Sequence, residues 1–360
     1  MKKTLFAALA LAFVASCSNE EVVEMAQKEA IAFDKTFVNN STRSVVDPSY
    51  NNDNLFRDFT VNGFVNQTQL FNNKTVTAKD VAADAAVTTN AAWEYSGVQY
   101  WVPGALYSFC AIAPSTSGGW TNLSSTLNGK PVENSEIIKT TFDFTNDGTT
   151  DLLYDEVPCV EGKTTGNSNV SFTFRHLLSK VKFSFENQYN GENATIKVTG
   201  IKITNAHKTA KAELTTNATT WGTLADPTLI LEFGDATDKE AENDDNHENT
   251  APATGYENGL TYESLNEMLL IPSSQEYEYK VEFTVALYIN NALIATYNHT
   301  GNNAAKVTFA PAAGYSYDIK AVINPSNINP DPNAEQEPIV FSVTGTETWK
   351  TPTTGTSVTI

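Results

Sequence analysis

The chain has 360 residues and a formal net charge of −19, from 42 acidic and 23 basic residues. This acidic balance disfavours nucleic acid and anionic membrane surfaces as partners, because both attract basic patches. The three cysteines are too few for a disulfide scaffold, and the length is enough for two domains.

The first residues have the pattern of a secretion signal. Two lysines precede an apolar run from Leu5 to Ala15, and Cys17 follows the small residue Ser16. Because this run is about half the roughly 20 apolar residues of a membrane span, we expect residues 1–16 to be a signal peptide. Cys17 is then the lipid-bearing N-terminus, and an ordinary signal with a chance cysteine is the alternative.

After the signal, Thr, Asn, Val, Phe and Tyr dominate, and short alternating segments recur between turn-rich stretches. This pattern predicts an all-β fold. Helical signal is weak: a short helix is expected at Val76–Val87, and another turn or two at Thr261–Met268.

Two segments alternate but change parity within a long predicted strand. Between Phe172 and Phe185 the change lies near Ser179, and between Ile196 and Ile203 it lies at Gly200. One extra residue shifts parity in this way, so both segments are predicted to be long strands with a β-bulge.

The clearest strand runs from Tyr279 to Ile289, with apolar side chains at every second position. Asn290 and Asn291 then form a two-residue turn, and Leu293 to Tyr297 returns as the hairpin partner. The same alternation predicts a strand from Tyr315 to Ile323.

The domain boundary is predicted at the turn-rich segment Gln188–Asn193, with Gly162–Asn169 as the competing position. The expected domains are residues 44–190 and 191–360. Each would hold about seven strands, the usual number for a sandwich domain. Two β-sandwich domains in tandem are therefore expected.

No catalytic or cofactor motif occurs in the sequence, so we expect neither an enzyme nor a bound cofactor or metal. His176 is interpreted as a core histidine rather than a general base. The acidic run Asp235–Glu248 lacks the order of an EF-hand and is interpreted as a solvated loop rather than a calcium site. Cys110 and Cys159 are expected to stay unbridged, with a disulfide as the alternative.

Aromatic residues offer one further kind of site, because sugars stack on flat rings. Trp93, Tyr95, Tyr100 and Trp101 lie near one another in the sequence, and Trp120 lies in a loop rich in serine and glycine. Alternation places many such rings in the core, where they bury large areas. A glycan site is therefore the secondary interpretation.

Five ordered segments carry a family resemblance: YWVPGALYSFCAIAP at 100–114, DLLYDE at 151–156, FRHLLSKVKF at 174–183, MLLIPSSQ at 268–275 and AAGYSYDIKAVI at 312–323. With the lipid signal, their order resembles the fimbrillin-like lipoproteins of Bacteroidetes, which are subunits of surface pili. The acidic residues after Cys17 resemble the signal that sends such lipoproteins to the outer face of the outer membrane. The resemblance implies two tandem transthyretin-like β-sandwich domains after a lipoprotein signal peptide.

The resemblance also implies a removable leader, here residues 17–43. In that family a protease cuts after an arginine, and the lipid anchor leaves together with a first strand. Ile31, Phe33 and Phe37 share parity in this region, as in a half-buried strand. They form the candidate displaced strand, whose groove would accept a strand from the next subunit.

Arg43 is the candidate cleavage site, with Ser44 as the new N-terminus. It lies in the polar loop NNSTRS, whereas Arg57 and Arg175 lie at or inside predicted strands, where a protease has poor access. A solvated loop arginine with no role is the alternative.

The C-terminal segment is the candidate donor strand for a neighbouring groove. Its apolar positions are Ile339, Phe341, Val343, Trp349, Val358 and Ile360. Head-to-tail contacts of this kind do not close on themselves, so they form filaments.

The leading hypothesis is therefore a structural, non-enzymatic subunit of a surface pilus. Its expected partners are other pilin subunits, the outer membrane through the lipid of the precursor, and an arginine-specific protease. The precursor would lie at the outer membrane and the processed form in the extracellular fimbria. The alternative is a surface-anchored binding module or tip adhesin, for which glycans are the candidate ligand.

Overall fold

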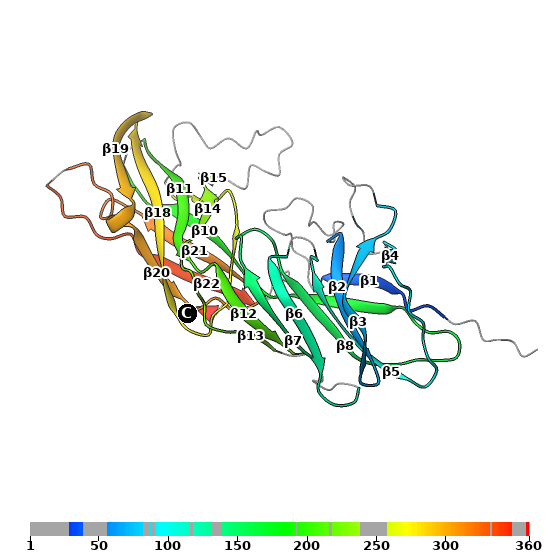
Figure 1. Cartoon of the computed structure of the whole chain (residues 1–360). Coiled ribbons are helices and arrows are strands. Elements are labelled where there is room, and N and C mark those ends of the chain that lie inside the picture. Colours follow the sequence, from blue (N-terminus) through cyan, green and yellow to red (C-terminus); the bar gives the residue numbers. More distant parts are fainter. Residues whose placement is uncertain are drawn as a thin grey trace, which may run out of the picture.

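The computed structural model describes residues 29–38, 56–81, 87, 91–115, 118–131, 138–191, 193–215, 218–237, 258–331, 333–347 and 358–359, with side chains for all but 35–38, 346–347 and 358–359. Within these residues the regular structure is β apart from a 3₁₀ turn at Gly301–Asn303, which confirms the predicted all-β class. No helix in this part of the chain is long and apolar enough to cross a membrane. Figure 1 shows an elongated molecule with two halves at opposite ends. The first half holds the strands up to residue 176 together with those at 209–221, and the second half holds the remaining strands from residue 179 on.

The first sheet holds N-terminal strands in the order β1-β9-β8-β5-β2-β3-β4. Neighbouring strands run antiparallel except β1 and β9, which are parallel. The strands are β1 (Phe33–Val38), β2 (Asp58–Val65), β3 (Thr68–Ala78), β4 (Trp93–Glu94), β5 (Leu106–Ala113), β8 (Leu153–Glu161) and β9 (Val170–His176).

The central strand β5 is buried on both faces. Side chains alternate across a strand, so Tyr107 and Phe109 point into one core and Cys110 and Ile112 into another. We call the first the aromatic core, because phenylalanines from β1, β2, β3, β5 and β9 meet in it.

The second face of β5 packs on a smaller sheet, in the order β13-β12-β7-β6. Its strands are β6 (Trp120–Leu127), β7 (Ile138–Thr145), β12 (Thr209–Leu214) and β13 (Thr219–Trp221). The core between these layers also takes in Leu177, Leu178, Leu269 and Ile271. We call it the junction core, because these four residues come from the second half or from the link to it.

The second half is a sandwich of two sheets around its own core. One sheet has the order β15-β16-β10-β21-β22-β23 with β17 beside β10, and the other has the order β14-β11-β18-β19 with β20 beside β18. The strands are β10 (Ser179–Asn187), β11 (Ala194–Ala206), β14 (Leu229–Gly234), β15 (Ala236–Thr237), β16 (Thr261–Ser264), β17 (Met268–Leu270), β18 (Tyr277–Ile289), β19 (Ala292–His299), β20 (Ala305–Phe309), β21 (Tyr315–Ile323), β22 (Phe341–Glu347) and β23 (Val358–Thr359).

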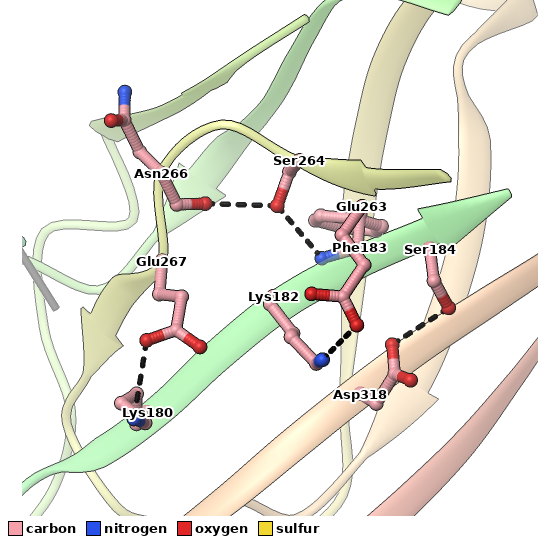
Figure 2. Close-up of polar contacts among 9 residues, drawn as sticks. All are labelled: Lys180, Lys182, Phe183, Ser184, Glu263, Ser264, Asn266, Glu267 and Asp318. Atoms are coloured by element: carbon pink, nitrogen blue, oxygen red, sulfur yellow. Dashed lines mark hydrogen bonds and ion pairs between the residues drawn. The ribbon is translucent and has the colours of Figure 1, made fainter. Parts of the chain in front are cut away.

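Polar side chains hold β10 to its neighbours on the face away from this core (Figure 2). Lys182 pairs with Glu263 of β16, and Ser184 Oγ donates to Asp318 Oδ1 of β21 at 2.8 Å. Burial raises the pKa of the Asp318 carboxyl, and the Lys182 charge opposes this shift. The alternation along β10 thus separates an apolar inner face from a charged outer one.

The predicted hairpin and the strand after it are confirmed. The strand expected at Tyr279–Ile289 is β18, and Asn290 and Asn291 turn the chain into β19 with φ of 51° and 64°. Asparagine tolerates this left-handed backbone better than most residues. The strand predicted at Tyr315–Ile323 is β21.

Of the two predicted bulges, one is present and one is wrong. The register of β11 shifts around Gly200, whose φ of 64° suits glycine. Near Ser179, however, the chain forms two strands rather than one bulged strand, because β9 ends at His176 and β10 joins a different sheet. Leu177 and Leu178 are fully buried between them, so the apolar pattern runs through the break.

The helix predicted at Thr261–Met268 is wrong. These residues form β16 and the start of β17, which both pair with β10. Pairing in a sheet overrides a weak local preference for helix. In the other predicted helix, Val76–Val87, the residues up to Ala78 belong to β3, and residues 82–86 lie outside the described residues.

The domain division near residue 190 and the transthyretin-like subtype stay predictions. In the strand pairing, β10 belongs to the second sandwich although it ends at Asn187. Strand β12 (residues 209–214) pairs back with β7, and β13 (residues 219–221) pairs with β12, so both join the sheet of β6 and β7 (Figure 1). The chain therefore returns to the first half after it has entered the second.

Candidate strand-exchange groove

The N-terminal segment 29–38 lies in a groove between two parts of the first half. On one side it meets residues 99–101, where the Ile31 N–H donates to the Gln99 carbonyl at 2.8 Å. On the other side β1 pairs in parallel with β9. β1 is the edge strand of this sheet, and residues 29–31 before it lie against residues 99–101. We call the space that segment 29–38 fills the groove.

Two large side chains of this segment fill the groove. Ile31 is 1% exposed and Phe33 is 3% exposed. The Phe33 ring lies 5.6–6.2 Å from five aromatic rings, in edge-on or stacked geometry. These rings belong to Phe59, Phe71, Tyr95, Phe109 and Phe172. Burial of each side chain contributes about 1.5–3 kcal/mol to the stability of the fold.

Polar groups hold the segment on both sides of this buried pair. The Glu29 carboxylate accepts hydrogen bonds from the Asn167 N–H at 2.8 Å and from its side-chain amide at 2.6 Å, and both lower the pKa of Glu29. The Asp34 carboxylate accepts from the Asn169 amide and the Ser171 hydroxyl, each at 2.9 Å. The groove thus offers hydrogen-bond donors at two points along the strand.

Sequence reasoning missed these walls of the groove. Tyr95, whose hydroxyl donates to the Ile31 carbonyl at 2.7 Å, has no sequence signal beyond its place among other aromatic residues. Asn167 lies in a polar loop and meets Glu29 from 138 residues away. Only the order of the strands in the sheet brings such groups together.

The strand predicted at Ile31–Val38 is present as β1, and along the backbone Phe37 pairs with Thr173. The residues predicted for lipidation and processing lie outside the described residues: Cys17, Arg43 and Ser44. Their roles, like the displacement of the strand, stay predictions.

The candidate donor residues lie in the second half of the same chain. Ile339 and Val343 are buried in its core, and Phe341 packs against this core while partly exposed. β22 pairs with β21, and Val358 in β23 pairs with β22. The other two candidates lie outside the described residues: Trp349 and Ile360. Within one chain, the candidate donor and the groove lie in different sheets.

Other candidate residues occupy structural positions. His176 Nδ1 lies 2.5 Å from Asp151 Oδ2 with both side chains largely buried, which fits its interpretation as a core histidine. Cys110 and Cys159 are unbridged, as predicted, and burial raises the pKa of the Cys110 thiol. Most of the acidic run Asp235–Glu248 lies outside the described residues.

Of the aromatic residues considered for sugar stacking, all but Tyr100, which is 47% exposed, lie in or against the cores. Trp93 and Trp101 are buried, and Tyr95 lines the groove. Trp120 is partly buried, with its indole N–H donating to the Pro114 carbonyl at 2.9 Å. These positions favour the structural interpretation over a sugar platform.

An acidic residue beside the groove makes the stability of the fold depend on pH. Asp155 on β8 accepts a hydrogen bond from the Thr173 N–H at 2.6 Å, and burial raises its pKa from 3.8 to about 6. A raised carboxyl pKa means that the folded state holds the proton more tightly than the unfolded state. Stability is therefore lost as the pH rises from about 4 to about 6.

Over this pH range, we expect the free energy of unfolding to fall by roughly 2–3 kcal/mol less in Asp155→Asn than in the wild type. The amide keeps a hydrogen-bond acceptor but cannot ionise. Urea unfolding of both proteins across this pH range checks the prediction. The advantage of the variant should grow as the pH rises through the Asp155 pKa, and parallel stability profiles would show that Asp155 is not responsible.

The sequence matches the fimbrillin-like family model over residues 42–344. Because this match covers most of the chain, the protein belongs to the fimbrillin-like family, and the resemblance drawn from the sequence is confirmed. Family membership places the protein among fimbrial proteins of the cell surface. None of the curated proteins matches the chain significantly.

Among solved structures, the chain is similar to a fimbrial protein from Bacteroides vulgatus, with 16% identity and a TM-score of 0.50 over 88% of this chain and 99% of that one. It is also similar to a fimbrial assembly protein from Parabacteroides distasonis, with 9% identity and a TM-score of 0.40 over 89% of this chain and 95% of that one. At this level of identity, the first likeness shows a shared fold and no more.

Proposed function

We propose that this protein is a structural, non-catalytic subunit of a cell-surface pilus, exported as a lipidated precursor and assembled by strand exchange. Cys17 carries the lipid and holds the precursor at the outer membrane. An arginine-specific protease cuts after Arg43 and releases the leader, residues 17–43, with its strand. The partners are other pilin subunits, each of which fills the groove of the next.

The position of β1 carries this proposal. β1 lies at the edge of its sheet, and its segment completes the aromatic core with Ile31 and Phe33. A cut at Arg43 would leave the segment held by non-covalent contacts alone. Its departure would expose the backbone edge of β9 and the two apolar sites that Ile31 and Phe33 had filled. Such an edge recruits another strand.

The C-terminal strands supply the incoming strand in this proposal. β22 carries alternating apolar residues and pairs with β21 in the second half. A donor at one end of the chain and a groove at the other join subunits head to tail. Such contacts do not close into a ring unless the rotation between subunits permits it, so they build a filament.

Arg43→Lys provides a matched test, because it keeps the charge but removes the arginine. An arginine-specific protease should convert the wild-type precursor to a chain that starts at Ser44, followed by a ladder of polymers on gels. The variant should stay intact and monomeric with this protease, yet give the same products with a protease that also cuts after lysine. A wild-type chain that is fully cut and remains a monomer would contradict strand exchange.

A further inference from the structure

The segment that fills the groove has a counterpart near the C-terminus. Residues 29–34 read Glu-Ala-Ile-Ala-Phe-Asp, and residues 337–342 read Glu-Pro-Ile-Val-Phe-Ser. The two agree at the first, third and fifth positions. In the groove, the first position is Glu29, whose carboxylate is bound by Asn167. The third and fifth are the buried Ile31 and Phe33.

We infer that residues 337–342 of a second copy of this protein enter the groove in the register of residues 29–34, parallel to β9. Glu337, Ile339 and Phe341 then take the places of Glu29, Ile31 and Phe33. The inference rests on the proposed strand exchange, and it adds which residues enter the groove, in which direction and at which register.

The groove encloses the shared side chains more completely than their present site does. Phe33 has five aromatic neighbours, whereas Phe341 has three within the described residues, at 5.6–6.2 Å, and is only partly buried. Ile31 is 1% exposed, compared with 6% for Ile339. The groove therefore buries more apolar area of these two side chains than their present site does.

The positions that differ are also compatible with the groove. Ala30 bridges Tyr100 through the N–H of Ile31 and the carbonyl of Glu29, so its own N–H takes no part in that bridge. Proline lacks an N–H and fits such a position, which accounts for Pro338. The fourth position is Ala32, which is half-buried in the groove. Val340 is now 72% exposed and would be more buried in that position.

Polar contacts at both ends of the segment can be kept. The Glu337 side chain is exposed at its present place, and in the groove its carboxylate would meet the two Asn167 donors. At the last position Ser342 would replace Asp34 and meet Ser171. A hydroxyl offers acceptors there as the carboxylate does.

Ser342 and Ser171 allow the register to be tested by disulfide formation. Both serines are exposed, and in the inferred register they lie opposite each other, as Asp34 and Ser171 do now. The chain with Ser171→Cys, Ser342→Cys and Cys159→Ser should give, after cleavage and mild oxidation, a polymer ladder that survives denaturation until it is reduced. Thr344→Cys in place of Ser342→Cys is the matched control. It lies roughly 6.6 Å further along the strand, beyond the reach of the disulfide, and should give no covalent ladder.

The outcomes of this experiment distinguish the inferred register from the proposed strand exchange. A non-covalent polymer without the 171–342 link, or one linked through residue 344, would overturn the inferred register and leave strand exchange standing. Absence of any polymer after complete cleavage would overturn the proposed assembly and the inference with it.

A competition experiment tests the equivalence of the two segments without engineered cysteines. Synthetic peptides of residues 29–35 and 337–343 should each block polymerisation of the cleaved subunit, and each should displace the other from the groove. The 337–343 peptide with Phe341→Ala should bind about 100-fold more weakly. Failure of the wild-type 337–343 peptide to compete would overturn the inference.

Discussion

A cleaved subunit kept from polymerising is expected to unfold roughly 10 °C or more below the precursor. Loss of the leader removes the Ile31 and Phe33 side chains from the groove. Burial of each contributes about 1.5–3 kcal/mol to the stability of the fold. The Ile31 N–H also loses its bond to the Gln99 carbonyl, and each such bond contributes about 0.5–1.5 kcal/mol. Because whole folds are stable by only about 5–15 kcal/mol, the empty groove should bring the first half close to unfolding.

Dilution gives access to this state, because polymerisation requires two chains to meet. Thermal unfolding of the dilute, cleaved protein after removal of the leader measures the effect. A synthetic peptide of residues 29–38 should restore the unfolding temperature of the precursor, and the same peptide with Phe33→Ala should not. Equal unfolding temperatures for the precursor and the empty subunit would show that the segment is not needed for the fold.

Phe33→Ala is expected to destabilise the precursor by about 3–5 kcal/mol and to leave the polymer unchanged. The first effect follows from the cavity that the substitution leaves among five aromatic rings. The second follows from the proposed processing, since residue 33 departs with the leader. Urea unfolding of the precursor and of the assembled polymer measures both effects.

Phe172→Ala is the matched control for this substitution. Its ring stacks on Phe33 with the centroids 6.0 Å apart and is fully buried, but it belongs to β9 and stays with the subunit. This variant should destabilise the precursor and the polymer alike. If Phe33→Ala weakened the polymer as much as Phe172→Ala does, the first strand would still be present in the polymer.

Alternation with period two locates strands well where one face is buried and the other is not. β18 and β21 have this form, and both agree with the sequence-based prediction. The same pattern fails between β9 and β10, because Leu177 and Leu178 are buried in the junction core and hide the change of sheet. The weak helical preference at Thr261–Ser264 misleads for another reason, because pairing with β10 rather than local propensity sets the structure there.

The groove could be predicted only in part. The parity of Ile31 and Phe33 is a local signal, and it indicates a half-buried strand. Their partners carry no local signal, since Tyr95 meets Ile31 across 64 residues and Asn167 meets Glu29 across 138. Those contacts depend on the pairing of β1 with β9 and on the bridge between Ala30 and Tyr100, which the period of a single strand does not encode.

The N-terminal residue of the subunit in purified surface filaments tests the proposed assembly most directly. Terminal sequencing or mass spectrometry of intact subunits should find Ser44, with the strand at residues 29–38 absent from the filament. A lipid-bearing Cys17 at the N-terminus of the filament subunit, with β1 still attached to its own chain, would contradict assembly by strand exchange.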